Sequence, residues 1–274
     1  MVSKEMSFLD HLEELRWHLV RSFAAIFIVA MIVFVKINFV FDAILLAHLK
    51  PDFSTYQFFC KVFSSLGIDS SFCNISFKQT LQALNPTQQL MTAIWSSLIL
   101  GFVIAFPYVI WEFWRFIAPG LHETERKKSR GFIFTASSLF FLGILFSYYV
   151  IIPMSVYFFY NFEISATIQN NFKLEAYISL ITNSLVGVAI FFELPVVIFF
   201  LTRVGLITPL FLRKYRKHAF IVVLILSAII TPPDVASQII VSVPIMILYE
   251  LSIYVASFVS KKQLKNVSKS PKVQ

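Results

Sequence analysis

Two acidic pairs border long apolar stretches of this sequence. Glu13 and Glu14 come shortly before the first apolar stretch, and Glu123 and Glu125 follow the second. The functional interpretation is that Glu14 and Glu125 are two carboxylates at the same membrane face, where they could belong to one binding site. The alternative is that both are ordinary charges, Glu14 on a solvated face and Glu125 complementing the start of a helix.

A third acid, Glu193, lies inside an apolar stretch and is followed closely by Pro195. A charged group near the middle of a bilayer costs about 2.5–3.5 kcal/mol on insertion scales, so a partner, a wet cavity or protonation normally offsets it. An intramembrane acid is for that reason a functional hypothesis, and we expect Pro195 to bend the helix that carries it. The alternative is a buried hydrogen bond to Asn183 or Ser184.

Two further acids have structural interpretations. Asp234 ends the segment TPPD, in which Pro232 and Pro233 predict a hard turn, and it can cap the helix that follows. Glu250 lies in the last apolar stretch, where it can pair with a base or extend toward the interface.

Several enzyme classes are excluded by missing motifs. The sequence contains no glycine-rich phosphate loop, no His-Glu-x-x-His metal motif and no Gly-x-Ser-x-Gly elbow. Its two cysteines also exclude a multi-cysteine metal site. We therefore expect neither an enzyme nor a bound metal or cofactor.

The elements that position these acids are predicted to be membrane helices. Of 274 residues, 58% are apolar and 14% charged, against about 25% charged in an ordinary soluble domain. A helix needs about 20 residues to cross the hydrocarbon core. The apolar stretches predict an all-α membrane protein with six transmembrane helices at about 19–36, 90–117, 132–152, 178–201, 218–231 and 235–259. The apolar run within the fifth stretch, residues 219–230, gives only about 18 Å of helix, which predicts a short span.

The two ends of the chain differ from this membrane region. Apolar residues recur at helical spacing in 7–16, which predicts an amphipathic helix along the inner membrane surface before the chain turns into the first span. We assign residues 1–260 to a single six-span membrane domain. Residues 261–274 are basic and contain serine, which predicts a disordered cytoplasmic tail.

The distribution of Lys and Arg predicts the orientation. With both termini in the cytoplasm, the inner segments carry most of the 23 Lys and Arg residues, and the outer segments carry only Lys36, Lys50, Lys61, Lys78 and Lys173. The positive-inside rule therefore favours this orientation, and it explains the net charge of +8 without nucleic-acid binding. Cys60 and Cys73 then lie in the outer segment 37–89, where a disulfide and two free thiols are both open.

Four segments, in order and with matching spacing, resemble the TatC family, the large subunit of the twin-arginine protein translocase. They are HLEELR (11–16), FIAPGL with ER (116–121 and 125–126), FELP (192–195) and TPPDVASQ (231–238). The resemblance extends over about residues 7–260. It implies a glove-shaped bundle of six helices with short fifth and sixth spans, in the inner membrane of a bacterium.

The resemblance also implies a function. The protein would be a receptor for the twin-arginine signal peptides of folded cargo and the core subunit of a translocase that uses the proton-motive force. It would work with single-span TatA/TatB-type subunits in the lipid bilayer, in several copies. The signal-peptide-binding residues would be Glu14, Glu125, Arg16 and Phe116, the partner-subunit contacts Glu193 and Gln238, and the structural residues Pro119, Pro195, Pro232, Pro233 and Asp234.

Two positions depart from the family pattern. His18 stands where a second arginine is usual, and 85–91 lacks the usual Ser-Pro with its acidic and aromatic residues.

The rival functions are a proton-coupled secondary transporter of a small solute, with Glu193 as proton carrier, and a passive assembly scaffold. The lack of an internal repeat argues against the transporter. A scaffold, unlike a receptor, would not bind signal peptides without its partners.

Overall fold

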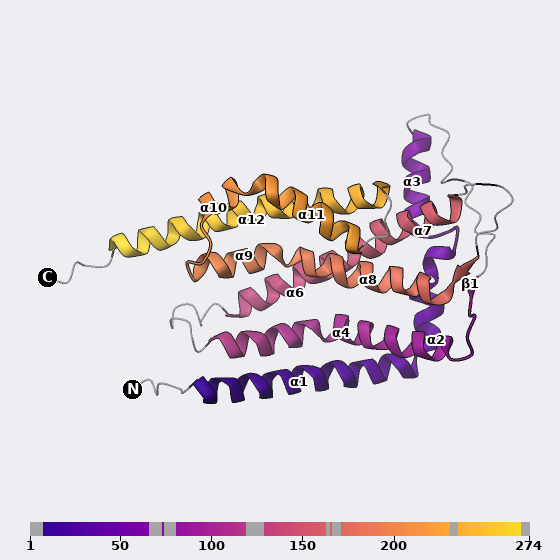
Figure 1. Cartoon of the computed structure of the whole chain (residues 1–274), viewed down its shortest axis with the longest axis horizontal. Coiled ribbons are helices and arrows are strands. Elements are labelled where there is room, and N and C mark those ends of the chain that lie inside the picture. The colour runs from indigo at the N-terminus through magenta and orange to yellow at the C-terminus, as the bar shows by residue number, and fades with distance from the viewer. Residues whose placement is uncertain are drawn as a thin grey trace. The chain divides into compact units, whose positions relative to one another are not determined.

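The computed structural model describes residues 8–65, 73, 81–118, 129–162, 165, 171–230 and 235–269, which are almost entirely helical (Figure 1). The chain forms two compact units. The first comprises Met1–Ala47, Gln82–Ser138 and Lys173–Ile178, and the second comprises His48–Leu81, Leu139–Phe172 and Ser179–Gln274. One short sheet pairs β1 (Leu81–Gln82) with β2 (Phe172–Lys173).

The first unit is built on α1 (Phe8–Val35) and α4 (Gln88–Ile117), which lie side by side in Figure 1. Their crossing is close because Gly101 of α4 faces Ala30 of α1. A Cβ atom on Gly101 would lie 2.8 Å from the Ala30 Cβ. Small residues at a crossing let two helix backbones approach, as is common in membrane bundles. The unit continues in α2 (Ile37–Val40) and the π-helical turn η1 (Phe41–Leu45).

The N-terminal segment differs from its prediction. The amphipathic residues that we expected to lie along the membrane surface are the first part of α1, which runs without a break from Phe8 to Val35. These residues include no Gly or Pro. The change from an amphipathic to an apolar pattern alters which side chains are exposed, but nothing in it interrupts the backbone hydrogen bonds of the helix.

The second unit contains most of the remaining helices. Two helices pass into it from the first unit along the chain, α6 (Ser129–Phe146) and α8 (Leu174–Phe192). Its other helices are α3 (Ser54–Ser65), η5 (Ser147–Ile151), α7 (Ile152–Asn161), α9 (Leu194–Arg203), α10 (Pro209–Lys214), α11 (Arg216–Ile230) and α12 (Val235–Lys269). Its core packs apolar side chains of η5, α8, α11 and α12 together, among them Ile151, Val188, Val223, Val241 and Ile245.

Five stretches of the described residues are long and apolar enough to cross a membrane: Leu12–Val35, Gln88–Ile117, Gly131–Asn161, Leu174–Arg203 and Gln238–Lys261. They match five of the six predicted spans. The remaining one corresponds to α11, whose 15 residues give about 22 Å of helix. The resemblance implied a short sixth span, but the helix that carries this span is long. This helix, α12, has 35 residues and continues to Lys269, through part of the predicted tail.

A π-helical turn attaches the segment after η1 to the helices of the second unit. A π turn leaves main-chain carbonyls outside the regular α-helical hydrogen bonds. In η5, the Tyr148 carbonyl lies 3.0 Å from His48 Nε2, and the Tyr149 carbonyl accepts from the Thr55 hydroxyl at 2.6 Å. The Tyr56 hydroxyl donates to the carbonyls of His48 and Pro153. Burial of this phenol raises the pKa of Tyr56 above its ordinary value.

The two cysteines form a disulfide between Cys60 of α3 and Cys73. The sequence left free thiols equally open, and the structure decides for the bond, because no described cysteine is free. The bond closes a loop with a sequence separation of 13.

Candidate functional site

Three polar residues of α1 lie on one face of that helix. Glu14, His18 and Ser22 are four residues apart, a spacing that places side chains above one another on a helix. His18 and Ser22 are buried, and the Ser22 hydroxyl donates to the His18 carbonyl at 2.9 Å. Glu14, one turn toward the N-terminus, is 37% exposed. The face therefore runs from a buried interior to a partly open end.

The matching residues of α4 surround a buried carboxylate. Glu112 is 1% exposed, and its Oε1 accepts a hydrogen bond from the Tyr108 hydroxyl at 2.9 Å. Arg115 Nη1 lies 3.5 Å from the same oxygen. Arg115 also stacks over the Trp111 ring, with 4.9 Å between its Cζ and the ring centroid. A carboxylate buried to this extent needs such partners, because an unpaired charge in a protein interior is costly.

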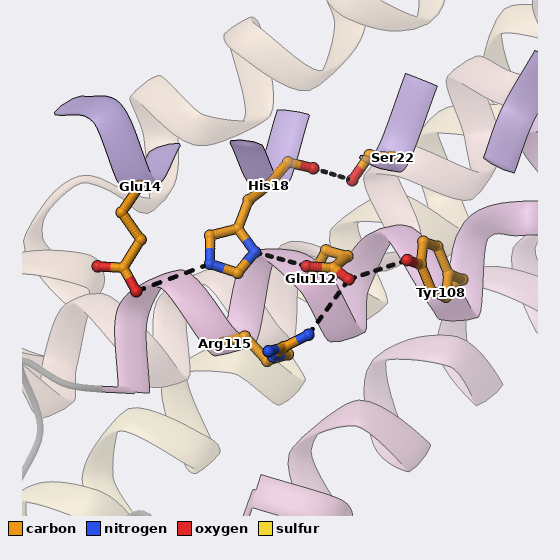
Figure 2. A network of polar contacts seen from close by, with 6 residues as sticks. All are labelled: Glu14, His18, Ser22, Tyr108, Glu112 and Arg115. Carbon is orange, nitrogen blue, oxygen red and sulfur yellow. Dashed lines mark hydrogen bonds and ion pairs between the residues drawn. The ribbon is translucent and has the colours of Figure 1, made fainter. Parts of the chain in front are cut away.

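His18 joins the two helices. Its Nδ1 lies 2.5 Å from Glu112 Oε2, and its Nε2 lies 4.0 Å from Glu14 Oε1. Figure 2 shows the resulting chain of contacts from Glu14 through His18 to Glu112 and Tyr108. The edge of the Phe116 ring faces the imidazole, with 6.3 Å between the ring centroids. Two acids from distant parts of the sequence thus flank one histidine.

A pocket of about 460 Å³ opens beside this network. Its lining residues are Glu14, Trp17, His18, Arg21 and Arg115. Glu14 Oε2 is buried and has no hydrogen-bond partner among the described residues. Buried acceptors nearly always have a donor, so this oxygen indicates a place for one. The pocket therefore offers a carboxylate acceptor, two guanidinium donors and an indole side chain.

Comparison with known proteins identifies the family. A sequence model of the family described as Sec-independent protein translocase protein (TatC) matches residues 10–244. The chain belongs to the TatC family. It is 44% identical over 260 residues to the Sec-independent protein translocase protein TatC of Blattabacterium sp. subsp. Periplaneta americana, covering 94% of this chain and 98% of the relative. It is 30% identical over 266 residues to TatCy of Bacillus subtilis, covering 97% and 94%.

A solved structure agrees with this assignment. The crystal structure of the twin arginine translocase receptor TatC superimposes on this chain with a TM-score of 0.71 at 31% identity, covering 91% of this chain and 99% of that one. The chain is therefore a membrane-protein component of Sec-independent protein translocation. The recognition of the TatC family from four sequence segments is confirmed.

The predicted inner-face residues are only partly placed by the structure. Glu14 lies in the pocket, and Phe116 contacts His18 at its edge. Arg16 points elsewhere: it pairs with Glu13 at 3.6 Å, both side chains being 65% exposed, and lies 5.5 Å from the Trp17 ring centroid. Glu125 and Pro119 lie outside the described residues.

Glu193 lies at a break between two helices. α8 ends at Phe192 and α9 begins at Leu194, with Pro195 in its first turn, so the helix that we expected Pro195 to bend is interrupted at Glu193. Glu193 is 9% exposed, a hydrogen bond joins its carboxyl group to the Phe140 backbone, and its Oε1 has no partner among the described residues. Neither alternative partner bonds to it: Asn183 donates to Ser179, and the Ser184 hydroxyl is unpartnered within the described residues.

The predicted residues near the last two helices have structural contacts. Gln238 Nε2 donates to the Leu224 carbonyl at 3.0 Å, which joins α12 to α11. Glu250 pairs with Arg216 at 2.6 Å, so the pairing interpretation of this acid is confirmed. Pro232, Pro233 and Asp234 lie outside the described residues.

Sequence reasoning missed Glu112. It lies inside the second predicted span, in the segment WEFWR (111–115), and an acid within an apolar stretch was the same signal that selected Glu193. Arg115 three residues later offers it an i,i+3 partner, which makes the acid resemble an ordinary helix-surface charge. The unusual histidine at position 18 was the second signal, because a buried carboxylate on a neighbouring helix would account for it.

Proposed function

We propose that this chain is the signal-peptide receptor of its translocase and that the pocket of Glu14, Trp17, His18, Arg21 and Arg115 holds part of the twin-arginine motif. The observation that carries the proposal is Glu14 Oε2, a buried acceptor beside the pocket with no donor among the described residues. Leaving such a group unsatisfied costs about 1–3 kcal/mol, and more when it is charged. A ligand that brings a guanidinium group removes this cost.

The composition of the pocket favours a peptide over a simple cation. An arginine side chain can donate to Glu14 and stack on the Trp17 indole, since guanidinium is planar and weakly hydrated. Arg21 and Arg115 can donate to main-chain carbonyls, which a peptide supplies and a simple cation does not. An extended peptide presents arginine side chains and free carbonyls together.

The second arginine of the motif requires a second acceptor. Glu112 does not serve, because His18, Tyr108 and Arg115 already surround its carboxylate. Glu125 remains our candidate for this role. Phe116, which contacts His18, would form part of the same site, and Arg16 would act at its outer edge by releasing Glu13.

The proposed orientation places this site at the cytoplasmic face. Lys and Arg concentrate in the segments that include both termini, which favours six spans with both ends inside. The Cys60–Cys73 disulfide supports an outer location for 37–89, because such bonds persist in oxidising compartments. α11 then serves as a short span, and the protein resides in the inner membrane of a bacterium, with the six helices in a glove shape.

Glu193 is our candidate contact for the single-span partner subunits. Its carboxyl group is buried within a span, at a helix break, and one oxygen has no partner among the described residues. A polar group on a partner helix would satisfy it, since hydrogen bonds between helices stabilise association in a bilayer. Gln238 is our second candidate contact, and it would be free to bind a partner only if α11 releases its side chain. We further propose that several copies of the chain act together and that the proton-motive force drives export.

Photo-cross-linking to a twin-arginine peptide tests the receptor role. The chain in membrane vesicles, without partner subunits, carries Glu14→Gln. Glu175→Gln is its control, because Glu175 is an exposed acid in the first turn of α8 and does not line the pocket. We expect Glu14→Gln to lower the cross-linking yield at least about tenfold, the effect of one charge-assisted hydrogen bond. A yield that stays at the parent level in Glu14→Gln would contradict the proposal.

A further inference from the structure

We infer that His18 positions Glu14 for guanidinium binding, and that its bond to Glu112 is what holds the imidazole in place to do so. The inference rests on the proposed receptor function and assigns a role to a pair that the sequence did not predict. His18 would not contact the peptide's guanidinium group. It would act through Glu14, as a positioning residue that sets how sharply the pocket prefers arginine to lysine.

The pair fixes the orientation of the imidazole ring. Nδ1 contacts Glu112 Oε2 at 2.5 Å, and the Glu112 side chain is itself held by Tyr108 and Arg115. The side chain of His18 is 8% exposed and that of Glu112 is 1% exposed, so little water competes for the contact. Ser22, one turn further along α1, donates to the His18 carbonyl. Because the ring is bound in this way, its other nitrogen, Nε2, points in a fixed direction.

That nitrogen faces Glu14. Nε2 lies 4.0 Å from Glu14 Oε1, which is too long for a hydrogen bond but close enough to orient the carboxylate by electrostatic attraction when the ring is protonated. Figure 2 shows one oxygen of Glu14 directed at the ring and the other directed away. The oxygen without a partner, Oε2, thus keeps its hydrogen-bonding capacity unused while the other oxygen is held.

Holding one oxygen matters for selectivity. A bidentate bond needs both the position and the plane of the carboxylate to match the guanidinium fork, whereas an ammonium group accepts many orientations. A carboxylate that rotates freely therefore loses more of its affinity for arginine than for lysine. Removing the positioning residue should weaken the binding of a twin-arginine peptide and bring it closer to that of a twin-lysine peptide.

The alternative is that the pair only joins α1 to α4. Asparagine and glutamine separate the two roles because of where their amide nitrogen lies. In His18→Asn the amide nitrogen is as many bonds from Cβ as Nδ1, so the variant retains a donor to Glu112 but has nothing facing Glu14. In His18→Gln the nitrogen corresponds to Nε2, so the variant keeps a group near Glu14 and loses the donor to Glu112.

The experiment measures peptide affinity for the full chain in detergent, with twin-arginine and twin-lysine peptides, beside thermal unfolding of each variant. We expect His18→Asn to keep the parent's unfolding temperature, to bind the twin-arginine peptide about tenfold more weakly, and to lose part of its preference over twin-lysine. In a Glu14→Gln background, His18→Asn should cause no further loss, because its effect passes through Glu14.

Three results would overturn the inference. Parent-like affinity in His18→Asn would show that Nε2 is not needed. An equal loss in the parent and Glu14→Gln backgrounds would show a merely structural role. Undiminished binding by Glu14→Gln alone would remove the receptor site and this inference with it, which separates that failure from the other two. If His18→Asn does not fold, Glu112→Gln, which retains an acceptor for Nδ1 but loses its charge, is expected to show the same selective loss in smaller degree.

Discussion

Replacing Gly101 by alanine tests how closely α1 and α4 approach. The added Cβ would lie 2.8 Å from the Ala30 Cβ and 2.9 Å from the Ala30 Cα and backbone nitrogen. Carbon atoms in contact normally lie about 3.5–4.0 Å apart, so the two helices must separate by roughly 0.7 Å. Two of the three neighbouring atoms are backbone, which no side-chain rotation can move away.

The expected cost follows from two opposed effects. Overpacking a well-packed interface costs about 1–3 kcal/mol, whereas alanine is favoured over glycine in a helix by about 1 kcal/mol. Gly131 of α6 provides the matched control, because a Cβ there would meet nothing within 4 Å. We therefore expect Gly131→Ala to be neutral or stabilising, and Gly101→Ala to be less stable than Gly131→Ala by about 1–3 kcal/mol.

Thermal unfolding in detergent measures this difference. For a chain of this size, 1 kcal/mol corresponds to about 2–4 °C, so the two variants should unfold several degrees apart. Adding Ala30→Gly to Gly101→Ala should restore only part of the lost stability. This second substitution removes the Ala30 Cβ, but the Ala30 Cα and backbone nitrogen still lie too close to the new Cβ. Equal stabilisation by Gly101→Ala and Gly131→Ala would refute the close crossing.

Three other predictions concern the second unit. Cys60→Ser should lower stability by about 3 kcal/mol, the entropy of a loop of roughly this length, and a mobility shift on non-reducing gels that persists in this variant would contradict the bond. Tyr56→Phe should cost about 1–3 kcal/mol by removing the donor to two buried carbonyls. The neutral phenol of Tyr56 is favoured in the fold, so parent stability should fall as pH rises above the ordinary tyrosine pKa of about 10. The same fall should be smaller in Tyr56→Phe. Glu193→Ala should reduce co-purification with the single-span subunits more than Glu193→Gln does, since glutamine keeps hydrogen-bonding capacity, and equal recovery from both variants would argue against a partner contact.

The sequence was informative where one element's own residues decide the outcome. Long apolar stretches are required by the thickness of the bilayer, so five spans could be found without any knowledge of their neighbours. The break at Glu193 was equally accessible, because Pro195 acts on its own helix. The continuity of α1 was missed because a change in polarity was interpreted as a change in direction, although no residue there breaks a helix.

Features that depend on two elements were not accessible in this way. Pairing of His18 with Glu112 requires a particular rotation of α1 and α4 about their axes and a particular shift along them. The sequence restricts these only through small residues such as Gly101, whose partner it does not name. The same limit applies to Gln238, whose contact with the Leu224 carbonyl joins two helices through a main-chain atom that carries no sequence signal.

The π turn at Ser147–Ile151 also sets the phase of α7 relative to α6. Each residue of an α-helix advances the side-chain direction by about 100°, and a π turn accommodates one extra residue. Deleting a single residue there would convert the π turn into a regular α-helical turn, which would remove the carbonyls that His48 and Thr55 contact. Homologues should therefore tolerate exchanges of amino acid in this stretch far better than a change in its length.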